Sequence, residues 1–293
     1  MSQALRGHAA MLLFSALVAG SFSLGVLAAP HIAPTALNAL RFAIASVLVG
    51  VAALATTGIP RHALHAPWRY FVLGGVFAIY FVLMFEGLKT AQPVSASAVF
   101  TLTPLMSAIA GYVLLRQITT RWMAAALSIG GAGAVWVIFR ADLSALLQFQ
   151  IGDGEIIYFW GCVAHAIYTP LVRKLNRGEP AVVFTFGMLV ACCLIVTAWG
   201  WQDIRATDWA NLPDIVWITL IYVAVFASAV TFVLLQYASL RLPSAKVMAY
   251  TYLTPSWVLV WELFMGNGTP PALVLVGVGL SIVALVMLLE GDR

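Results

Sequence analysis

The sequence predicts an all-α polytopic membrane protein with ten transmembrane helices in two inverted five-helix repeats. The first observation is composition: 62% of the 293 residues are hydrophobic, only 9% are charged, and the mean hydropathy is +0.98. Because soluble domains carry about 25% charged residues, a soluble fold is excluded. The second observation is a repeated motif, since Leu102-Thr103-Pro104 returns as Leu253-Thr254-Pro255. A fixed offset of this kind, about 150 residues, indicates internal duplication.

Ten apolar stretches reach the length of about 20 residues that crosses the hydrocarbon core of a bilayer. We assign the spans to residues 8–28, 35–57, 68–88, 92–115, 119–139, 154–173, 180–201, 212–239, 243–265 and 271–289. The first stretch has the position of a secretory signal, but its apolar run is long and Ala28-Ala29-Pro30 is a poor cleavage site. We therefore expect it to be a membrane helix.

A linker over residues 141–153, expected on the outer side, divides the chain into a first repeat (1–140) and a second repeat (154–293). Because each half has five spans, the second half enters the membrane from the opposite face, and the repeats are inverted. A second pair of motifs, Phe85-x-x-Leu88-Lys89 and Tyr237-x-x-Leu240-Arg241, keeps nearly the same offset. Many secondary transporters have inverted repeats, with the substrate site near the bilayer midplane between the halves.

Basic residues predict the orientation, because cytoplasmic loops carry an excess of Lys and Arg. With the N-terminus inside, eleven cations lie on the inner side and three on the outer side. The inner cations are Arg6, Arg61, Arg69, Arg116, Arg121, Arg173, Lys174, Arg177, Arg241, Lys246 and Arg293, and the outer ones are Lys89, Arg140 and Arg205. We expect a multi-pass protein of a bacterial-type inner (plasma) membrane, surrounded by the lipid bilayer, with both termini cytoplasmic. The net charge of +4 resides in these short loops and does not indicate a nucleic-acid partner.

Polar and aromatic residues at mid-membrane depth are candidates for a transport pathway, because a polar group in hydrocarbon is costly and usually faces a cavity. Spans three, four, six, eight and nine have such residues on one helical face, whereas spans two, five, seven and ten are mostly aliphatic and suit an outer ring. The candidate cavity residues are Tyr80, Met84, Ser97, Thr101, His165, Ser228, Met248, Tyr250, Thr251 and Tyr252. Hydroxyl residues in membrane helices also bond to their own backbone or allow close packing, and that alternative stays open for each of them.

Five residues within the spans have specific structural or functional interpretations. The repeat-related prolines Pro104 and Pro255 each remove a backbone hydrogen bond, which predicts a hinge at each position. His165 lies near the middle of span six, where it either lines the cavity or is a packed histidine with a partner. Arg41 and Glu86 lie near the outer ends of their spans, so we expect them to reach the interface or to form structural ion pairs.

Several classes of function are not indicated. The chain has no Gly-x-Ser-x-Gly, no His-Glu-x-x-His, no Walker-type phosphate loop and no pair of intramembrane aspartates. Cys162, Cys192 and Cys193 fall inside apolar runs and are expected to be packed thiols rather than disulfide partners or metal ligands. A passive channel stays an alternative, although no span has a ring of like charges and no loop resembles a selectivity filter. The sequence leaves the oligomeric state open.

Short motifs recur along nearly the whole chain. Span two contains Pro34-x-x-Leu37-x-x-x-Arg41-Phe42, span three ends in Gly87-Leu88-Lys89, and span six contains His165-Ala166-Ile167-Tyr168. In order and spacing these motifs resemble the EamA-type branch of the drug/metabolite transporter superfamily, with histidine where that family has tryptophan in span six. Within it, the run 252–257 is similar to aromatic amino acid exporters of the YddG type. The resemblance implies a ten-helix inner-membrane exporter with a central cavity between its halves and no cofactor.

The predicted function is efflux of amino acids, with aromatic and medium neutral ones preferred, and of related small metabolites by alternating access. The alternatives are a carrier for nucleotide sugars or cationic drugs, including a proton-coupled one, and a passive channel. No Asp lies in a span core, and Glu86 and Glu262 lie toward the outer ends, so His165 is the titratable group nearest the midplane. Either His165 couples protons, or transport is uncoupled and follows the substrate's own gradient. We predict uncoupled facilitated efflux.

Overall fold

The computed structural model describes residues 3–148, 150–268 and 271–290, and every regular element within these ranges is helical. The predicted all-α fold is therefore confirmed. The first half contains α1 (Gln3–Ala28), α2 (Pro34–Thr56), η1 (Arg61–Leu64), α3 (Trp68–Gly87), α4 (Pro93–Phe100), α5 (Thr103–Leu115) and α6 (Arg121–Ile138), and the short α7 (Leu143–Leu147) follows in the linker. The second half contains α8 (Asp153–Leu175), α9 (Ala181–Trp199), α10 (Trp201–Ala206), α11 (Asp214–Ala224), η2 (Val225–Val230), α12 (Thr231–Ser239), α13 (Ser244–Ala249), η3 (Tyr250–Leu253), α14 (Thr254–Phe264) and α15 (Ala272–Glu290).

The described residues contain nine helical segments that are long and apolar enough to cross a membrane. They correspond to the predicted spans one to eight and ten, with ends that differ by a few residues. The predicted ninth span is also helical throughout, but it is divided into α13, the 3-10 helix η3 and α14. None of these three pieces is long enough to cross a bilayer alone, since a span needs about 20 residues.

Local sequence explains where several helices begin. Pro34 starts α2 and Pro93 starts α4, a position where the missing N–H of proline is not needed for an intrahelical bond. The side chain of Thr120 accepts a hydrogen bond from the backbone N–H of Met123 at 3.2 Å and caps α6. These signals lie at the ends of apolar stretches, so the helix boundaries follow from composition and capping together.

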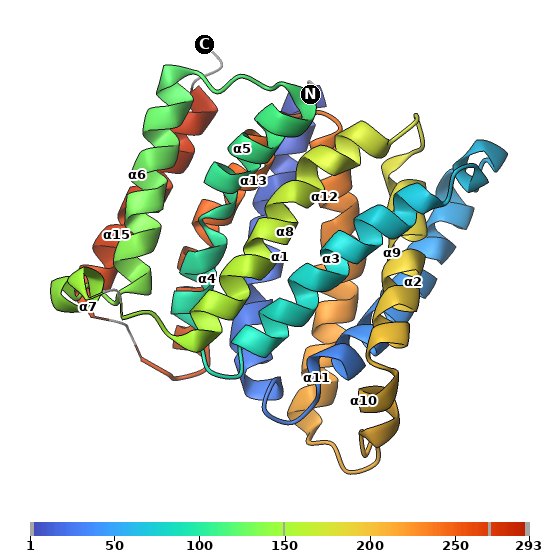
Figure 1. Cartoon of the computed structure of the whole chain (residues 1–293), viewed down its shortest axis with the longest axis horizontal. Helices are drawn as coiled ribbons and strands as arrows, with labels where there is room; N and C mark the ends of the chain where they lie inside the picture. Colours follow the sequence, from blue (N-terminus) through green and yellow to red (C-terminus); the bar gives the residue numbers. More distant parts are fainter. Residues whose placement is uncertain (1–2, 149, 269–270, 291–293) are drawn as a thin grey trace.

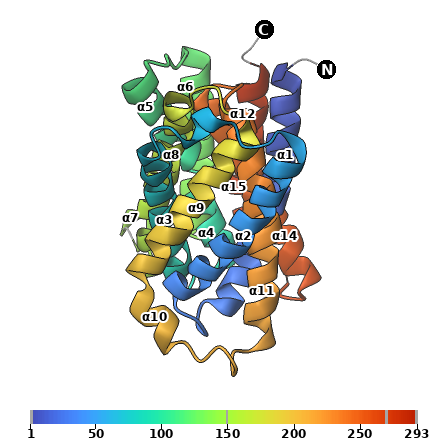
Figure 2. The same ribbon diagram turned by 90° about the vertical axis from the view of Figure 1, so that its right-hand side faces the viewer.

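The two halves interlock in a way that an inverted repeat produces. In Figures 1 and 2, α6 lies along α15 and α2 lies along α9, so equivalent helices of the two halves pair with each other. Two further pairs are related to each other by the repeat. The first is α3 with α8, and the second is the continuous helix α11–η2–α12, the counterpart of α3, with α1, the counterpart of α8. The start of α1 and the end of α15 lie at the same end of the molecule, the top of Figure 1. The central helices are α1, α3, α8 and α11–α12, whereas α2 and α15 are the least buried spans.

The two repeated Leu-Thr-Pro motifs occupy equivalent breaks in the fold. The fourth span is interrupted between α4 and α5 at Thr101 and Leu102, and Pro104 lies in the first turn of α5. The ninth span is interrupted by η3, and Pro255 lies in the first turn of α14. The hydroxyl groups of Thr103 and Thr251 lie 3.2 Å apart and join the two broken spans. The duplication seen in the sequence is therefore a duplication of a helix break.

The pairing of α6 with α15 depends on glycine. A methyl group placed on Gly133 would lie 2.6 Å from the carbonyl oxygen of Gly277, and one placed on Gly277 would lie 2.7 Å from the carbonyl oxygen of Gly133. The two backbones thus approach too closely for any side chain at the crossing. Small residues serve this purpose in membrane helices because packing, and not a hydrophobic effect, holds the helices together.

Candidate functional site

The centre of the bundle is a cluster of aromatic rings around His165. The imidazole of His165 on α8 has ring-centroid distances of 4.5 Å to Tyr80, 5.2 Å to Phe100 and 5.3 Å to Phe77. Tyr168, one turn further along α8, stacks on Phe77 with a centroid distance of 4.0 Å and an interplanar angle of 7°. The rings come from α3 and α4 of the first half and α8 of the second half. We call Phe77, Tyr80, Phe100, His165 and Tyr168 the central aromatic cluster.

Further rings extend the central aromatic cluster toward neighbouring helices. Phe232 of α12 lies 4.6 Å from Phe77 between ring centroids, and the hydroxyl groups of Tyr80 and Tyr158 are 3.1 Å apart. The sequence pattern places Phe77 and Tyr80 on one face of span three and Tyr158 and His165 on one face of span six, and the structure brings these four side chains together. The pattern gives no indication of Phe100 or Phe232, whose side chains have no polar atom and look like packing residues in an apolar span.

Several polar atoms close to the central aromatic cluster are buried without a hydrogen-bond partner among the described residues. They include Nδ1 of His165, Oγ1 of Thr169, Oγ1 of Thr231 and Oε1 of Gln236. The amide nitrogen of Gln236 donates to the hydroxyl of Tyr168 at 3.0 Å, which places this side chain beside the cluster. Buried polar groups normally have partners, so a group of unpartnered ones calls for an explanation. A polar ligand that enters when the bundle opens would supply such partners.

The hydroxyl candidates of span four bond to their own backbone. Ser97 donates to the carbonyl of Val94 at 2.7 Å, and Thr101 donates to the carbonyl of Ala98 at 2.6 Å. Met84 is fully buried on α3, and Met248 is fully buried on α13. The Oγ1 of Thr251 donates to the carbonyl of Met248 at 2.8 Å, within the break of span nine. A role for these residues in binding stays a prediction.

The two tyrosines of span nine point away from His165. The hydroxyl of Tyr250 lies 3.1 Å from Nδ1 of His8 on α1. The hydroxyl of Tyr252 points toward α6, where it lies 3.5 Å from the carbonyl oxygen of Leu127 and its ring packs over Gly130. The structure therefore does not bring Tyr250 and Tyr252 together with Tyr80 and His165. The 3-10 turn of η3 changes the helical phase here, so a regular face drawn from residue spacing does not apply.

Arg41 is a second polar centre, and the expectation that it reaches the interface or pairs with an acid is wrong. Its side chain is completely buried, and it forms no ion pair with any described residue. Its Nε donates to Oγ of Ser228 at 2.6 Å, one terminal nitrogen donates to the carbonyl of Ala227 at 2.7 Å, and the other donates to Oδ1 of Asn38 at 3.3 Å. Ser228 and Ala227 lie in η2, a π-helical turn, and such turns are frequent at functional sites. Glu86, in contrast, forms the expected ion pair, with Lys89 at 2.7 Å.

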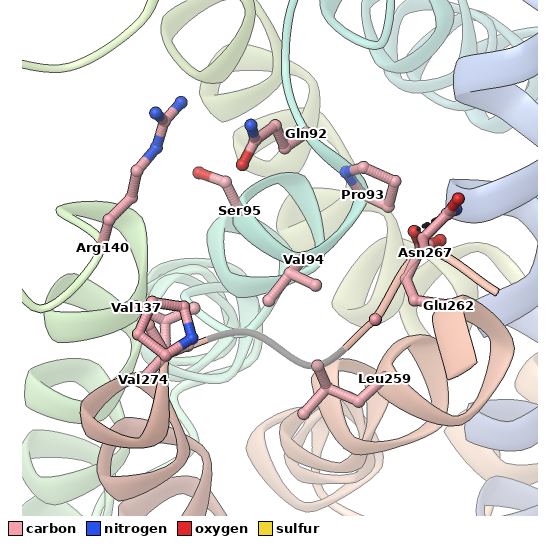
Figure 3. A pocket seen from close by; sticks show the side chains of 12 residues that line it. Gln92, Pro93, Val94, Ser95, Val137, Arg140, Leu259, Glu262, Asn267 and Val274 are labelled. Atoms are coloured by element: carbon pink, nitrogen blue, oxygen red, sulfur yellow. Dashed lines mark hydrogen bonds between the residues drawn. The ribbon is translucent and has the colours of Figure 1, made fainter.

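The centre is closed to both surfaces in this structure. Each of the ten candidate cavity residues is at most 5% exposed. A pocket of about 390 Å³ lies instead near the start of α4 and the ends of α6 and α14 (Figure 3). Figure 3 shows Arg140 on one wall and Glu262, which accepts a hydrogen bond from Asn267 at 2.9 Å, on the opposite wall. A transported molecule that reached the central aromatic cluster would therefore need the helices to separate.

A buried ion pair joins the two halves at the end that carries the start of α3. Arg69 donates to Oε1 of Glu179 at 2.7 Å and also to the carbonyl of Leu175 at 2.7 Å. Burial alone raises the pKa of the Glu179 carboxyl, but the hydrogen bonds from Arg69 and from the backbone N–H of Arg177 outweigh it and hold the pKa below its ordinary value of 4.5. Glu179 is therefore ionised near neutral pH. Within the described residues, no group of three or more His, Cys, Asp or Glu side chains is placed to hold a metal ion.

Comparison with known proteins gives three findings. The model of the EamA-like transporter family matches residues 5–139 and 153–290. The chain is 24% identical over 261 residues to "Uncharacterized transporter YyaM" of Bacillus subtilis (strain 168), which covers 88% of this chain and 84% of the relative. A crystal structure of a protein with 21% sequence identity superposes with a TM-score of 0.75 and covers 100% of this chain and 99% of that one, which supports the fold.

Proposed function

Because this chain belongs to the EamA-like transporter family, we propose that it exports aromatic and medium neutral amino acids and related small metabolites. It is a multi-pass membrane transporter and not an enzyme, as its family and its relative in Bacillus subtilis indicate. The observation that supports this substrate class is the central aromatic cluster with its unpartnered polar atoms. The aromatic rings would contact a flat apolar side chain, and the polar atoms without a partner among the described residues would bind a polar end.

The energetics of the central aromatic cluster favour aromatic and sulfur-containing side chains. Aromatic pairs contribute about 0.5–1.5 kcal/mol beyond burial, and contacts between sulfur and a ring about 0.3–1.5 kcal/mol. A substrate ring would replace ring contacts that the closed centre makes with itself, such as that between Phe77 and Tyr168. An aspartate side chain would lose its hydration among these rings without gaining stacking. The selectivity therefore favours phenylalanine, tyrosine, tryptophan and methionine over aspartate.

The proposed mechanism is alternating access with uncoupled facilitated efflux. The breaks in spans four and nine lie against each other at Thr103 and Thr251, which makes them suitable points for bending when one side opens. The pocket of Figure 3 would lie on the exit route at the outer side. Within the described spans no aspartate lies in a core position, and His165 is the titratable group in the central aromatic cluster that would carry a proton. Uncoupled export needs no such group, because cytoplasmic amino-acid pools often exceed those outside.

Counterflow in proteoliposomes tests this function. Purified protein is reconstituted with unlabelled phenylalanine inside, and entry of trace labelled phenylalanine is followed over a panel of competing amino acids. We expect transient accumulation of label, with strong competition by tryptophan, tyrosine and methionine and weak competition by aspartate. Stronger competition by aspartate than by tryptophan would refute the proposed pocket. Entry of label that does not saturate and shows no counterflow would indicate the passive channel instead.

A further inference from the structure

Arg41 is a buried cation with no acidic partner among the described residues. Its guanidinium lies within the membrane-spanning part of α2, is 0% exposed and has no carboxylate partner among the described residues. A charged side chain inside a membrane is costly, and such residues usually pair or mark a substrate pathway. Arg69, which is buried to a similar degree, has Glu179 as its partner. Of these two buried arginines, Arg41 is therefore the one that has no carboxylate partner in the described part of the chain.

The hydrogen bonds of Arg41 leave part of its binding capacity unused. Arginine has five N–H donors, and three of them have acceptors on Ser228, Ala227 and Asn38. The remaining two N–H groups have no acceptor within the described part of the chain. All three acceptors are neutral, so they fix the orientation of the guanidinium without neutralising its charge. A planar guanidinium held in this way is suited to a carboxylate, which it can bind through two parallel hydrogen bonds.

Arg41 is adjacent to the central aromatic cluster. Its guanidinium carbon lies 3.9 Å from the ring centroid of Phe81. The same Phe81 ring lies 4.5 Å from Tyr80 and 5.0 Å from Phe77, both of which contact His165. A single ring therefore separates the unpaired cation from the aromatic surface. That arrangement matches a ligand in which an aromatic group and a carboxylate are a few bonds apart.

We propose that Arg41 binds the carboxylate of the transported molecule, with Asn38, Ser228 and the π-helical turn of η2 as its positioning groups. This inference rests on the proposed function and narrows it: the substrates are carboxylates with an apolar side chain, and amines that lack a carboxylate are excluded. Cationic drugs are then poor substrates, because their positive charge would face the guanidinium. The carboxylate reaches Arg41 when the halves separate and Phe81 moves from its present place.

Two ligands that each lack one charged group of phenylalanine test this proposal. In the counterflow assay with the full chain, 3-phenylpropionate keeps the carboxylate and phenethylamine keeps only the ammonium group. For the wild type we expect 3-phenylpropionate to compete at least about tenfold more strongly than phenethylamine, since a hydrogen-bonded charge contributes this much. Arg41→Gln should weaken competition by phenylalanine and by 3-phenylpropionate by about tenfold or more, and competition by phenethylamine should stay unchanged. Arg41→Lys should restore part of the competition by phenylalanine and 3-phenylpropionate. The matched control is Arg205→Gln, on the exposed face of α10.

A thermal-unfolding measurement in detergent keeps the two proposals separate. If phenylalanine gives no counterflow, the proposed substrate is wrong, but 3-phenylpropionate should still raise the Tm of the wild type and of Arg205→Gln, and not that of Arg41→Gln. Equal shifts in wild type and Arg41→Gln, or none in the wild type, would overturn the carboxylate site. If Arg41→Gln does not fold, the wild type alone decides: competition by phenethylamine equal to that of 3-phenylpropionate contradicts the proposal.

Discussion

At the scale of single residues, His165 is the residue with which we test the predicted uncoupled efflux. Its imidazole is enclosed by Phe77, Tyr80 and Phe100, and its Nδ1 has no hydrogen-bond partner among the described residues. If export is uncoupled, His165→Ala removes ring contacts of about 0.5–1.5 kcal/mol and slows counterflow by about two- to tenfold, with equilibrium accumulation unchanged. The measurement is made in proteoliposomes with equal substrate on both sides and an imposed pH gradient. Net uphill movement in the wild type that His165→Ala abolishes would make His165 the coupling site and refute uncoupled efflux.

The pair Arg69–Glu179 predicts a pH dependence of stability. The folded pKa of Glu179 is lowered, so the pair stabilises the protein above pH 4.5 and this contribution is lost as the pH falls through the lower folded pKa. Glu179→Gln leaves Arg69 buried without its anion and should reduce the free energy of unfolding at pH 7 by about 3 kcal/mol. Thermal unfolding between pH 7 and pH 3 should show a smaller loss of stability for the variant than for the wild type.

Glu86→Gln is the matched control for that experiment. The ion pair of Glu86 with Lys89 is exposed, and pairs of this kind contribute about 0–1 kcal/mol. The control should therefore unfold like the wild type at pH 7. If Glu179→Gln and Glu86→Gln have the same free energy of unfolding, the buried pair contributes no more to stability than the exposed one, and the prediction is wrong.

At the scale of the helix, the two broken spans are the elements expected to move. Pro104 and Pro255 each follow the break in their span and prevent one backbone hydrogen bond across it. Pro104→Ala and Pro255→Ala allow this bond to form, which stiffens the break and adds about 1 kcal/mol to the barrier, so turnover falls about fivefold. Counterflow rates measure the effect, and Tm should be unchanged or higher.

Pro93→Ala provides the comparison for the two hinge variants. Pro93 is the first residue of α4, where its missing N–H has no role in the helix. Its replacement should leave turnover at the wild-type rate. If all three proline variants transport equally fast, the breaks at Pro104 and Pro255 are static features of the fold and not hinges.

For the whole molecule, the loop cations predict which end is cytoplasmic. Residues 61, 177 and 205 are all exposed, with 205 on α10 at the lower end of Figure 1. In a background without Cys162, Cys192 and Cys193, single cysteines at 61 and 177 should react with an impermeant reagent from the cytoplasmic side, and one at 205 from the outside. Labelling of 61 and 205 from the same side would contradict the predicted topology.

Much of the architecture follows from the sequence by itself. Hydropathy located nine of the ten predicted spans within a few residues, because the length of a span is set by the thickness of the bilayer. The repeated Leu-Thr-Pro motif located both helix breaks, because proline acts on the backbone of its own helix. The domain boundaries at residues 140 and 153 and the cytoplasmic position of the termini stay predictions.

Only the tertiary structure decided which side chains meet in the centre. Arg41 contacts Ser228 across 187 positions of the chain, and no local pattern predicts that a cation near a span end finds a π-helical turn instead of the interface. Tyr252 turned toward α6 because the 3-10 segment η3 changes the helical phase before it. The sequence thus determined the elements, whose lengths and breaks depend on nearby residues. The site depended on how two distant halves interlock, because the partners of a buried polar group are supplied by whichever helices pack beside it.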